Sequence, residues 1–297
     1  MKSTVINNEI SFDKKLAELI PSKEEIVKLL YRKPGYALHP NILWANPDTP
    51  SILKQISETA TTQKKTLVLI VDDYEYKYKR YKNLVLFRTS LRSSRRRNNE
   101  YVLPYVWECS EKAFSTSQPS SNPVVGFCGL VNKHRRKIIK TFQESNKIET
   151  NFIIRDKFWG GDPHNPSLIN EYEQNIKNSQ FVLCNRGNGN FSMRFYQSLA
   201  FGRIPVLVNT DMTLPFANDI PWRDLIVFEK TEKRCLEKVI AIHKYDEIGH
   251  RQKLCREIFD KYFHKDVVFP RLINTALAPK KTSWLSRILA NTTLSNF

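Results

Sequence analysis

The chain has 297 residues, of which 41% are hydrophobic and 11% aromatic, and this composition excludes a disordered polyelectrolyte and allows one large domain or two modest ones. Forty-seven Lys and Arg against thirty Asp and Glu give a net charge of +17, which indicates a polyanionic partner such as nucleic acid, anionic lipid, a nucleotide diphosphate or an acidic glycan. The five cysteines form no CxxC pair, and their odd number favours a reducing compartment over a disulfide framework.

The first half of the chain is predicted to contain buried parallel strands. Its short apolar runs end in polar or turn-forming residues, as buried strands tend to do. The predicted strands cover residues 41–45, 66–71 and 83–88, and residues 51–60 are predicted to form a helix. Ser and Pro accumulate over residues 110–123, where the hydrophobic periodicity lapses, so we expect two domains with the bounds 1–115 and 116–297.

Strands and helices alternate regularly in the second half. The predicted strands cover residues 124–129, 151–155, 180–185, 203–209 and 224–229, and the predicted helices cover 133–145, 167–179, a stretch after Phe191, 231–243 and 246–263. This alternation predicts an α/β fold in which helices cover both faces of a parallel sheet. Ligands of such sheets bind beyond the carboxyl ends of the strands, so the loops after Cys128, Ile154, Cys184 and Val208 are expected to line a site.

A glycine-containing turn follows the predicted strand at 180–185, where residues 185–192 read NRGNGNFS before the chain becomes helical. Glycines let a ligand approach the backbone, and the unpaired amides of the first helical turn favour an anion such as a diphosphate. Arg186 and Arg194 add permanent positive charge, and Asn190 or Ser192 is expected to cap the helix. An ordinary strand-to-helix turn has the same outline, so the turn alone does not specify a ligand.

The segment from Phe181 to Trp222 resembles the nucleotide-sugar half of the exostosin family of glycosyltransferases. The positions that match the family pattern in order are Phe181, Leu183, Arg186, Gly187, Gly189, Ser192, Arg194, Leu199, Gly202, Ile204, Pro205, Val206, Leu214, Pro215 and Trp222. Residues 86–105, 124–129 and 151–161 also look like segments of exostosin-like proteins from bacteria and lower eukaryotes. The resemblance therefore extends over residues 86–263.

This resemblance implies a GT-B architecture, in which two Rossmann-like domains face each other across a cleft and helices form the C-terminal tail. Residues 116–297 would bind the nucleotide-sugar, and residues 1–115 would serve the acceptor. The implied reaction transfers a sugar from a nucleotide-diphosphate donor, foremost a UDP-sugar, to a hydroxyl of a glycan or lipid-linked acceptor. The resemblance also implies that the reaction inverts the anomeric carbon and needs no metal or other cofactor. It further implies a place in surface polysaccharide or glycoconjugate synthesis.

The resemblance also assigns roles to individual residues. The expected donor ligands are Arg155, Arg186, Gly187, Gly189, Asn190, Ser192, Arg194 and Gln197. The family often has glutamate where this chain has Gln197, and glutamine can still hydrogen-bond a ribose but lacks the charge. For Arg155, a surface salt bridge is the alternative.

Inversion requires a base from the first half, for which Asp72, Asp73 and Glu100 are the candidates. Acidic residues after a strand are also common turn formers and helix caps. The Asp72-Asp73 pair fits a cation site as well, although the match in the second half disfavours a single-domain, metal-binding transferase. The six histidines show no zinc-ligand spacing.

Two other classes of function fit parts of the sequence. Residues 74–82 interleave tyrosines with basic residues and residues 92–97 add a dense positive patch, so single-stranded nucleic acid is an alternative partner, although no known nucleic-acid-binding motif is present. Gln197 leaves open a catalytically silent, glycan-binding relative.

No apolar stretch of signal-peptide length lies near the N-terminus, and the longest apolar run, at 66–71, is too short to cross a bilayer. We therefore expect a cytoplasmic protein. Residues 284–294 place apolar side chains on one side of a predicted helix that follows Lys280 and Lys281. This pattern fits either packing against the fold or peripheral contact with the anionic inner face of a membrane.

Overall fold

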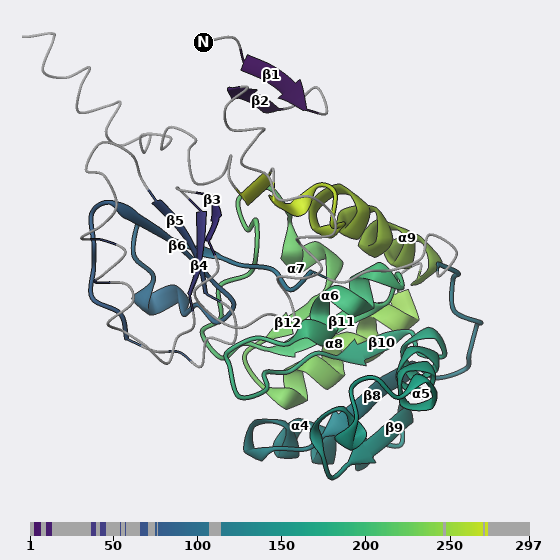
Figure 1. The fold of residues 1–297 in the computed structure, drawn as a ribbon. Coiled ribbons are helices and arrows are strands. Elements are labelled where there is room, and N and C mark those ends of the chain that lie inside the picture. The colour runs from purple at the N-terminus through teal and green to yellow at the C-terminus, as the bar shows by residue number, and fades with distance from the viewer. Residues whose placement is uncertain are drawn as a thin grey trace, which may run out of the picture.

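The computed structural model describes most of the chain between residues 77 and 272 and several shorter segments before it (Figure 1). The described residues are 3–6, 10–13, 37–39, 42–45, 54, 57, 66–70, 75, 77–106, 114–245, 248–269 and 271–272. The base candidates Asp72 and Asp73, the segment 284–294 and nearly all of the helix predicted over 51–60 lie outside these residues.

The first half is built on a five-stranded sheet. Its strands, in spatial order, are β3 (Ala37–His39), β4 (Ile42–Ala45), β5 (Thr66–Ile70), β6 (Leu84–Arg88) and β7 (Glu100–Val102). The pairs from β4 to β7 are parallel, and β3 is antiparallel to β4. The three strands predicted from the apolar runs are therefore confirmed as β4, β5 and β6. A separate antiparallel pair joins β1 (Ser3–Ile6) to β2 (Ile10–Asp13).

The second half is built on a parallel sheet of five strands. They are β8 (Val124–Leu130), β9 (Glu149–Arg155), β10 (Phe181–Leu183), β11 (Ile204–Val208) and β12 (Val227–Glu229). Their spatial order is β12-β11-β10-β8-β9, and all four pairings are parallel, as predicted. After β8 the chain adds β9 at one edge of the sheet, and it then returns to the other side of β8, where it adds β10, β11 and β12 in turn. The order thus reverses between β8 and β10, which is where sheets of this kind bind ligands.

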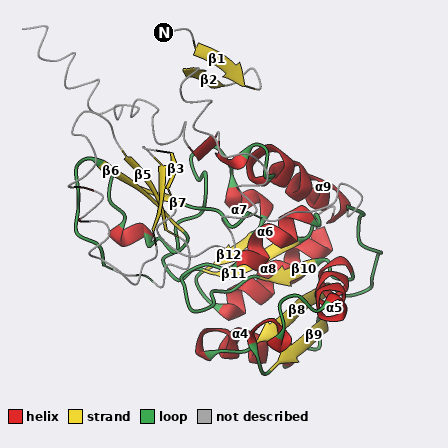
Figure 2. Cartoon of the chain, in the orientation of Figure 1, coloured by secondary structure: helices red, strands yellow, loops and turns green. Residues whose placement is uncertain are grey.

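Helices cover this sheet on both faces, as expected (Figure 2). They are α4 (Lys133–Gln143), α5 (Pro166–Lys177), α6 (Met193–Ala200), α7 (Trp222–Leu225), α8 (Glu232–Tyr245) and α9 (Ile248–Ile258), followed by a π-helical turn (Phe259–Phe263). α4 packs against α8, whereas α6 packs against α9. The strand predicted over 224–229 begins only at Val227, because α7 occupies the positions before it.

An aromatic cluster fixes α6 on the sheet. Phe195 of α6 lies with its ring 5.1 Å from those of Phe191 and Trp222, and Tyr196 lies 5.2 Å from Phe263. The indole nitrogen of Trp222 donates to the carbonyl of residue 215 at 2.7 Å, so this buried ring has a polar partner as well. The start of α6, and the loop before it, therefore rest on a rigid, fully buried base.

Two units, each with a five-stranded sheet that is parallel except for the β3–β4 pair of the first, form the GT-B-like architecture expected from the sequence, and the helices α8 and α9 follow the second sheet. The chain passes from one sheet to the other between Val102 and Val124. Segment 114–117 already packs on the second unit, where Arg203 donates to the Ser115 carbonyl at 2.6 Å. Among the residues that the structure describes, no helix combines the length and the apolar composition that a membrane span requires.

Candidate functional site

The guanidinium group of Arg194 lies across the point where the strand order reverses. It extends from α6 and donates to the Cys128 carbonyl of β8 at 2.5 Å and to the Leu183 carbonyl of β10 at 3.3 Å. Gly129 has a φ of +144°, and a Cβ at this position would lie 2.9 Å from a terminal nitrogen of Arg194. Only glycine therefore leaves room for the guanidinium group, which anchors both strand ends.

A second guanidinium group, that of Arg135, reaches the same strand ends from α4. It donates to the Leu130 carbonyl at 2.9 Å and to the Asn185 carbonyl at 3.3 Å. Burial, reinforced by the charge of Arg194, lowers the pKa of Arg135 to about 9, so the group is still cationic at neutral pH. The sequence analysis missed Arg135. The sequence feature that could have indicated Arg135 is its place as a basic residue in the first turn of the helix that follows β8.

The third guanidinium group belongs to Arg186 in the turn between β10 and α6. It donates at 3.1 Å both to the Asn190 side chain and to the Asn188 carbonyl, and so closes the turn on itself. A Cβ on Gly187 would lie 3.4 Å from a terminal nitrogen of Arg135, so the turn lies beside the second cation. Neither Gly187 nor Gly189 has the left-handed φ that often explains a glycine in a turn.

Three buried donor groups at or near this turn have no acceptor among the described residues. In the described part of the chain, Arg186 Nε, Arg194 Nε and Gln197 Nε2 are buried and bonded to no acceptor. Ser192 stands at the N-cap of α6 but makes no capping bond, and Asn190 uses its side chain on Arg186 and Thr210 instead. The first-turn amides of α6 thus lack a side-chain cap, and the positive end of the helix dipole adds to the three arginines.

The other expected donor ligands are held by neighbours in the second half. Gln197 is buried and accepts from the Tyr172 hydroxyl at 2.5 Å, and burial raises the pKa of Tyr172 to about 12, which keeps this donor protonated. Arg155 ends the edge strand β9 and donates to Glu171 at 2.5 Å and to the Leu168 carbonyl at 3.0 Å. Roles for Gln197 at a ribose and for Arg155 at a phosphate stay predictions.

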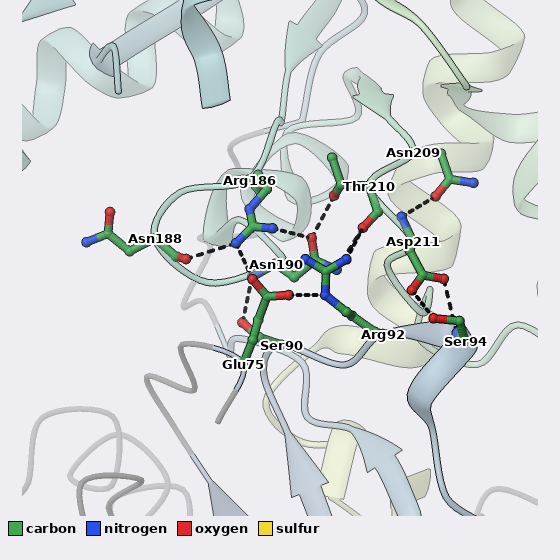
Figure 3. Close-up of polar contacts among 10 residues, drawn as sticks. All are labelled: Glu75, Ser90, Arg92, Ser94, Arg186, Asn188, Asn190, Asn209, Thr210 and Asp211. Carbon is green, nitrogen blue, oxygen red and sulfur yellow. Dashed lines mark hydrogen bonds and ion pairs between the residues drawn. The ribbon is translucent and has the colours of Figure 1, made fainter. Parts of the chain in front are cut away.

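The first half docks directly on this site through the segment that follows β6 (Figure 3). The Asn190 amide donates to the Ser90 hydroxyl at 2.9 Å. Ser94 contacts the Asp211 carboxylate through its amide, at 3.0 Å, and through its hydroxyl, at 2.5 Å. Asp211 has a φ of +66°, a conformation that Asp tolerates better than most residues. The two halves are therefore joined at the turn that carries Arg186.

Glu75 connects the two halves by charge. Its carboxylate forms ion pairs with Arg92 of the first half and with Arg186 of the second half (Figure 3). Burial raises the pKa of Glu75, but the hydrogen bonds and charges of the two arginines outweigh burial and hold the pKa below 4.5. The sequence analysis did not single out Glu75, which lies within the tyrosine-rich segment 74–82. Nothing in its local sequence indicates a partner 111 residues away.

Glu100, the described candidate for the base, lies in the first half beside Arg88. It is buried, contacts Arg88 at 3.2 Å and accepts from the Arg97 amide at 2.9 Å. Glu75 and Glu100 both line one pocket of about 380 Å³. In the described segments, His, Cys, Asp and Glu side chains form no group of three or more that could hold a metal ion.

Comparison with known proteins places these features in a family. A protein of Physcomitrium patens named "Probable glucuronosyltransferase 47 A" is 31% identical over 101 residues, which are 34% of this chain and 22% of that protein. "Probable beta-1,4-xylosyltransferase IRX10L" of Arabidopsis thaliana is 40% identical over 84 residues, which are 28% of this chain and 20% of that protein. The matched segment thus spans about a fifth of the length of these curated relatives.

Among solved structures, TarM is 11% identical, with a TM-score of 0.44 over 91% of this chain and 59% of that chain. The profile of the Exostosin GT47 domain matches residues 69–244, a range that includes Glu75, both arginine-bearing helices α4 and α6, and the turn between β10 and α6. Because this range is more than half of the 297 residues, the chain belongs to the exostosin GT47 family.

Proposed function

We propose that the protein is a glycosyltransferase that takes a sugar from a nucleoside-diphosphate donor, foremost a UDP-sugar, and transfers it to a hydroxyl of a glycan acceptor. The observation that carries the proposal is the convergence of Arg135, Arg186 and Arg194 at the ends of β8 and β10, beside the uncapped start of α6. Membership of the GT47 family, and relatives that are named glucuronosyl- and xylosyltransferases, support the same reaction class.

The charge at this site suits the departure of a diphosphate. As the bond between the anomeric carbon and the diphosphate oxygen breaks, negative charge grows on the leaving group. Arg186 and Arg135, together with the first-turn amides of α6, would stabilise that charge without a metal ion. Arg194 would act from beneath, because its two terminal nitrogens are already bonded to strand carbonyls and its role is to fix the strand ends.

Glu75 is the carboxylate best placed to act as the base. It touches the turn that carries Arg186 and also lines the pocket of the first half, so it lies between the proposed donor and acceptor sides. In an inverting displacement, the acceptor oxygen bonds to the anomeric carbon, its proton passes to the carboxylate, and the nucleoside diphosphate leaves. A diphosphate that binds Arg186 would compete with Glu75 and free it for this step.

The other candidates for the base remain open to the same test. Asp72 and Asp73 follow β5 in the sequence and precede Glu75 by three and two residues, respectively. Glu100 is held by Arg88 and by the Arg97 amide, both in the first half, and has no contact with the turn that carries Arg186 among those described above. We further propose a role in surface polysaccharide or glycoconjugate synthesis, with the net charge of +17 suited to a lipid-linked acceptor at the anionic inner face of a membrane.

Calorimetric titration with UDP-, GDP-, CMP- and dTDP-sugars tests the donor site. We expect one class to bind, and Arg135→Gln to weaken that binding at least about tenfold, the effect of losing one charge-assisted hydrogen bond. Arg136→Gln is the matched control, because Arg136 is the exposed neighbour on the same helix. Absence of binding by every class, or an equal loss in both variants, contradicts the proposal.

A further inference from the structure

The pocket of the first half is strongly basic. It has a volume of about 380 Å³, within the range of small-ligand sites, and is lined by Glu75, Lys77, Tyr78, Arg88, Ser90, Leu91, Arg92, Arg95, Arg97 and Glu100. Five of these side chains are cationic and two are carboxylates, which gives the lining a formal excess of three positive charges. Tyr78 and Leu91, both buried, supply apolar surface.

Three of the five cations are not neutralised by the lining. Arg88 pairs with Glu100, and Arg92 pairs with Glu75. Within the described part of the chain, Lys77, Arg95 and Arg97 have no carboxylate at ion-pair distance. Arginine side chains are well suited to bind carboxylate and phosphate groups, because one planar guanidinium group can donate two parallel hydrogen bonds. The pocket therefore has unused capacity for an anion.

The pocket adjoins the proposed donor site through shared residues. Arg92 and Glu75 line the pocket, and each also contacts the second half: Arg92 donates to the Thr210 carbonyl at 3.4 Å, and Glu75 pairs with Arg186. Ser90 lines the pocket and accepts from the amide of Asn190, in the turn that carries Arg186. A molecule in the pocket would therefore lie next to the donor turn, with Glu75, which contacts both Arg92 and Arg186, at the boundary between them (Figure 3).

We propose, on the basis of the glycosyltransferase function above, that this pocket binds an anionic group of the acceptor glycan, either a sugar carboxylate or a phosphate. Arg95 and Arg97 bind the anion, and Lys77 adds to the positive field. The apolar side chain of Leu91, which also lines the pocket, packs against the sugar ring that carries the charge. The bound anion holds the acceptor hydroxyl beside Glu75, at the boundary between the pocket and the donor turn.

The geometry favours a glycan over single-stranded nucleic acid. Tyr78 is buried beneath the Arg88 guanidinium group, which lies 4.8 Å from the centre of its ring. Tyr81 packs against the core of the first sheet. Of these two tyrosines of the segment 74–82, Tyr78 is therefore enclosed in the fold and Tyr81 is partly buried, which leaves little open aromatic surface on which successive bases could stack.

Calorimetric titration with acidic oligosaccharides, in the presence of saturating UDP, tests this proposal. The probes are an oligogalacturonate, its carboxyl-reduced neutral form and an oligosaccharide bearing a phosphate monoester. We expect at least one acidic probe to bind at least about tenfold more tightly than the neutral one. Binding of the carboxylate probe alone identifies a uronate, and binding of the phosphate probe alone identifies a phosphorylated acceptor.

The double variant Arg95→Gln/Arg97→Gln should weaken the preferred acidic probe about tenfold or more and leave UDP affinity unchanged. The control is Lys79→Gln/Arg80→Gln, which removes the same two charges from exposed positions outside the pocket. Equal affinity for acidic and neutral probes, an equal loss in both double variants, or tighter binding of a single-stranded oligonucleotide at the same residues overturns the proposal. Failure of all four classes of nucleotide-sugar to bind would instead overturn the glycosyltransferase function, so the two failures are distinguishable.

Discussion

Glu75→Gln is expected to tighten nucleotide binding and at the same time to abolish most of the transfer activity. The Glu75 carboxylate pairs with Arg186, whose side chain is only 7% exposed, and would have to give up this partner when a diphosphate arrives. The uncharged amide introduced by Glu75→Gln competes less with the diphosphate for Arg186. A hydrogen bond to a charged group contributes about 1.5–3 kcal/mol, and the 18% exposure of the Glu75 side chain favours the lower end, which is about tenfold in the dissociation constant.

The same substitution removes the proposed base, so turnover should fall by at least about 100-fold. Calorimetry with UDP measures the first effect, and release of UDP from the matching UDP-sugar in the presence of acceptor measures the second. Asp260→Asn serves as the control, since that carboxylate pairs with Arg256 on the C-terminal helices, away from the site. Weaker UDP binding in Glu75→Gln, or transfer at the wild-type rate, would refute this account of Glu75.

Three further predictions concern stability and reactivity. Because the pKa of Glu75 is held below 4.5, its ion pairs should stabilise the fold above that pH and lose this contribution as the pH falls through the lowered pKa; urea unfolding of wild type and Glu75→Gln should converge in acid. Gly202→Ala should cost at least about 1–3 kcal/mol in urea unfolding, because φ is +62° and the new Cβ would lie 2.2 Å from the Phe114 ring, whereas Gly249→Ala, with 3.9 Å of clearance, should be near neutral. Burial raises the pKa of Cys184 to about 11, so this thiol should resist iodoacetamide at pH 8 until the protein is unfolded, and rapid labelling of the native protein would contradict the buried position.

Local sequence was sufficient to predict most of the second sheet. Its strands are short apolar runs between polar turns, and its helices have amphipathic periods, so both signals lie within a window of a few residues. In the first sheet, the three-residue strands β3 and β7 were not predicted. The strand predicted over 224–229 was wrong at residues 224–226. The apolar residues there suit the single turn of α7 as well as they suit a strand, so the local pattern does not distinguish the two.

The candidate site was only partly predictable from the sequence. Arg186 and the glycine turn could be identified because they are contiguous and stand between a strand and a helix. Arg135 and Glu75 reach the turn from positions 51 and 111 residues earlier in the chain, and only the order of the strands and the docking of the two halves bring them there. The burial of Gln197 against Tyr172 likewise depends on packing between α5 and α6, which no local pattern specifies.

A crystal structure of the protein with UDP tests the central claim most directly. We expect the diphosphate at the ends of β8 and β10, with its oxygens about 2.7–3.2 Å from nitrogens of Arg186 and Arg135, and with Glu75 detached from Arg186. A diphosphate bound elsewhere, for instance in the basic pocket of the first half, with the pair between Glu75 and Arg186 intact, would contradict the claim.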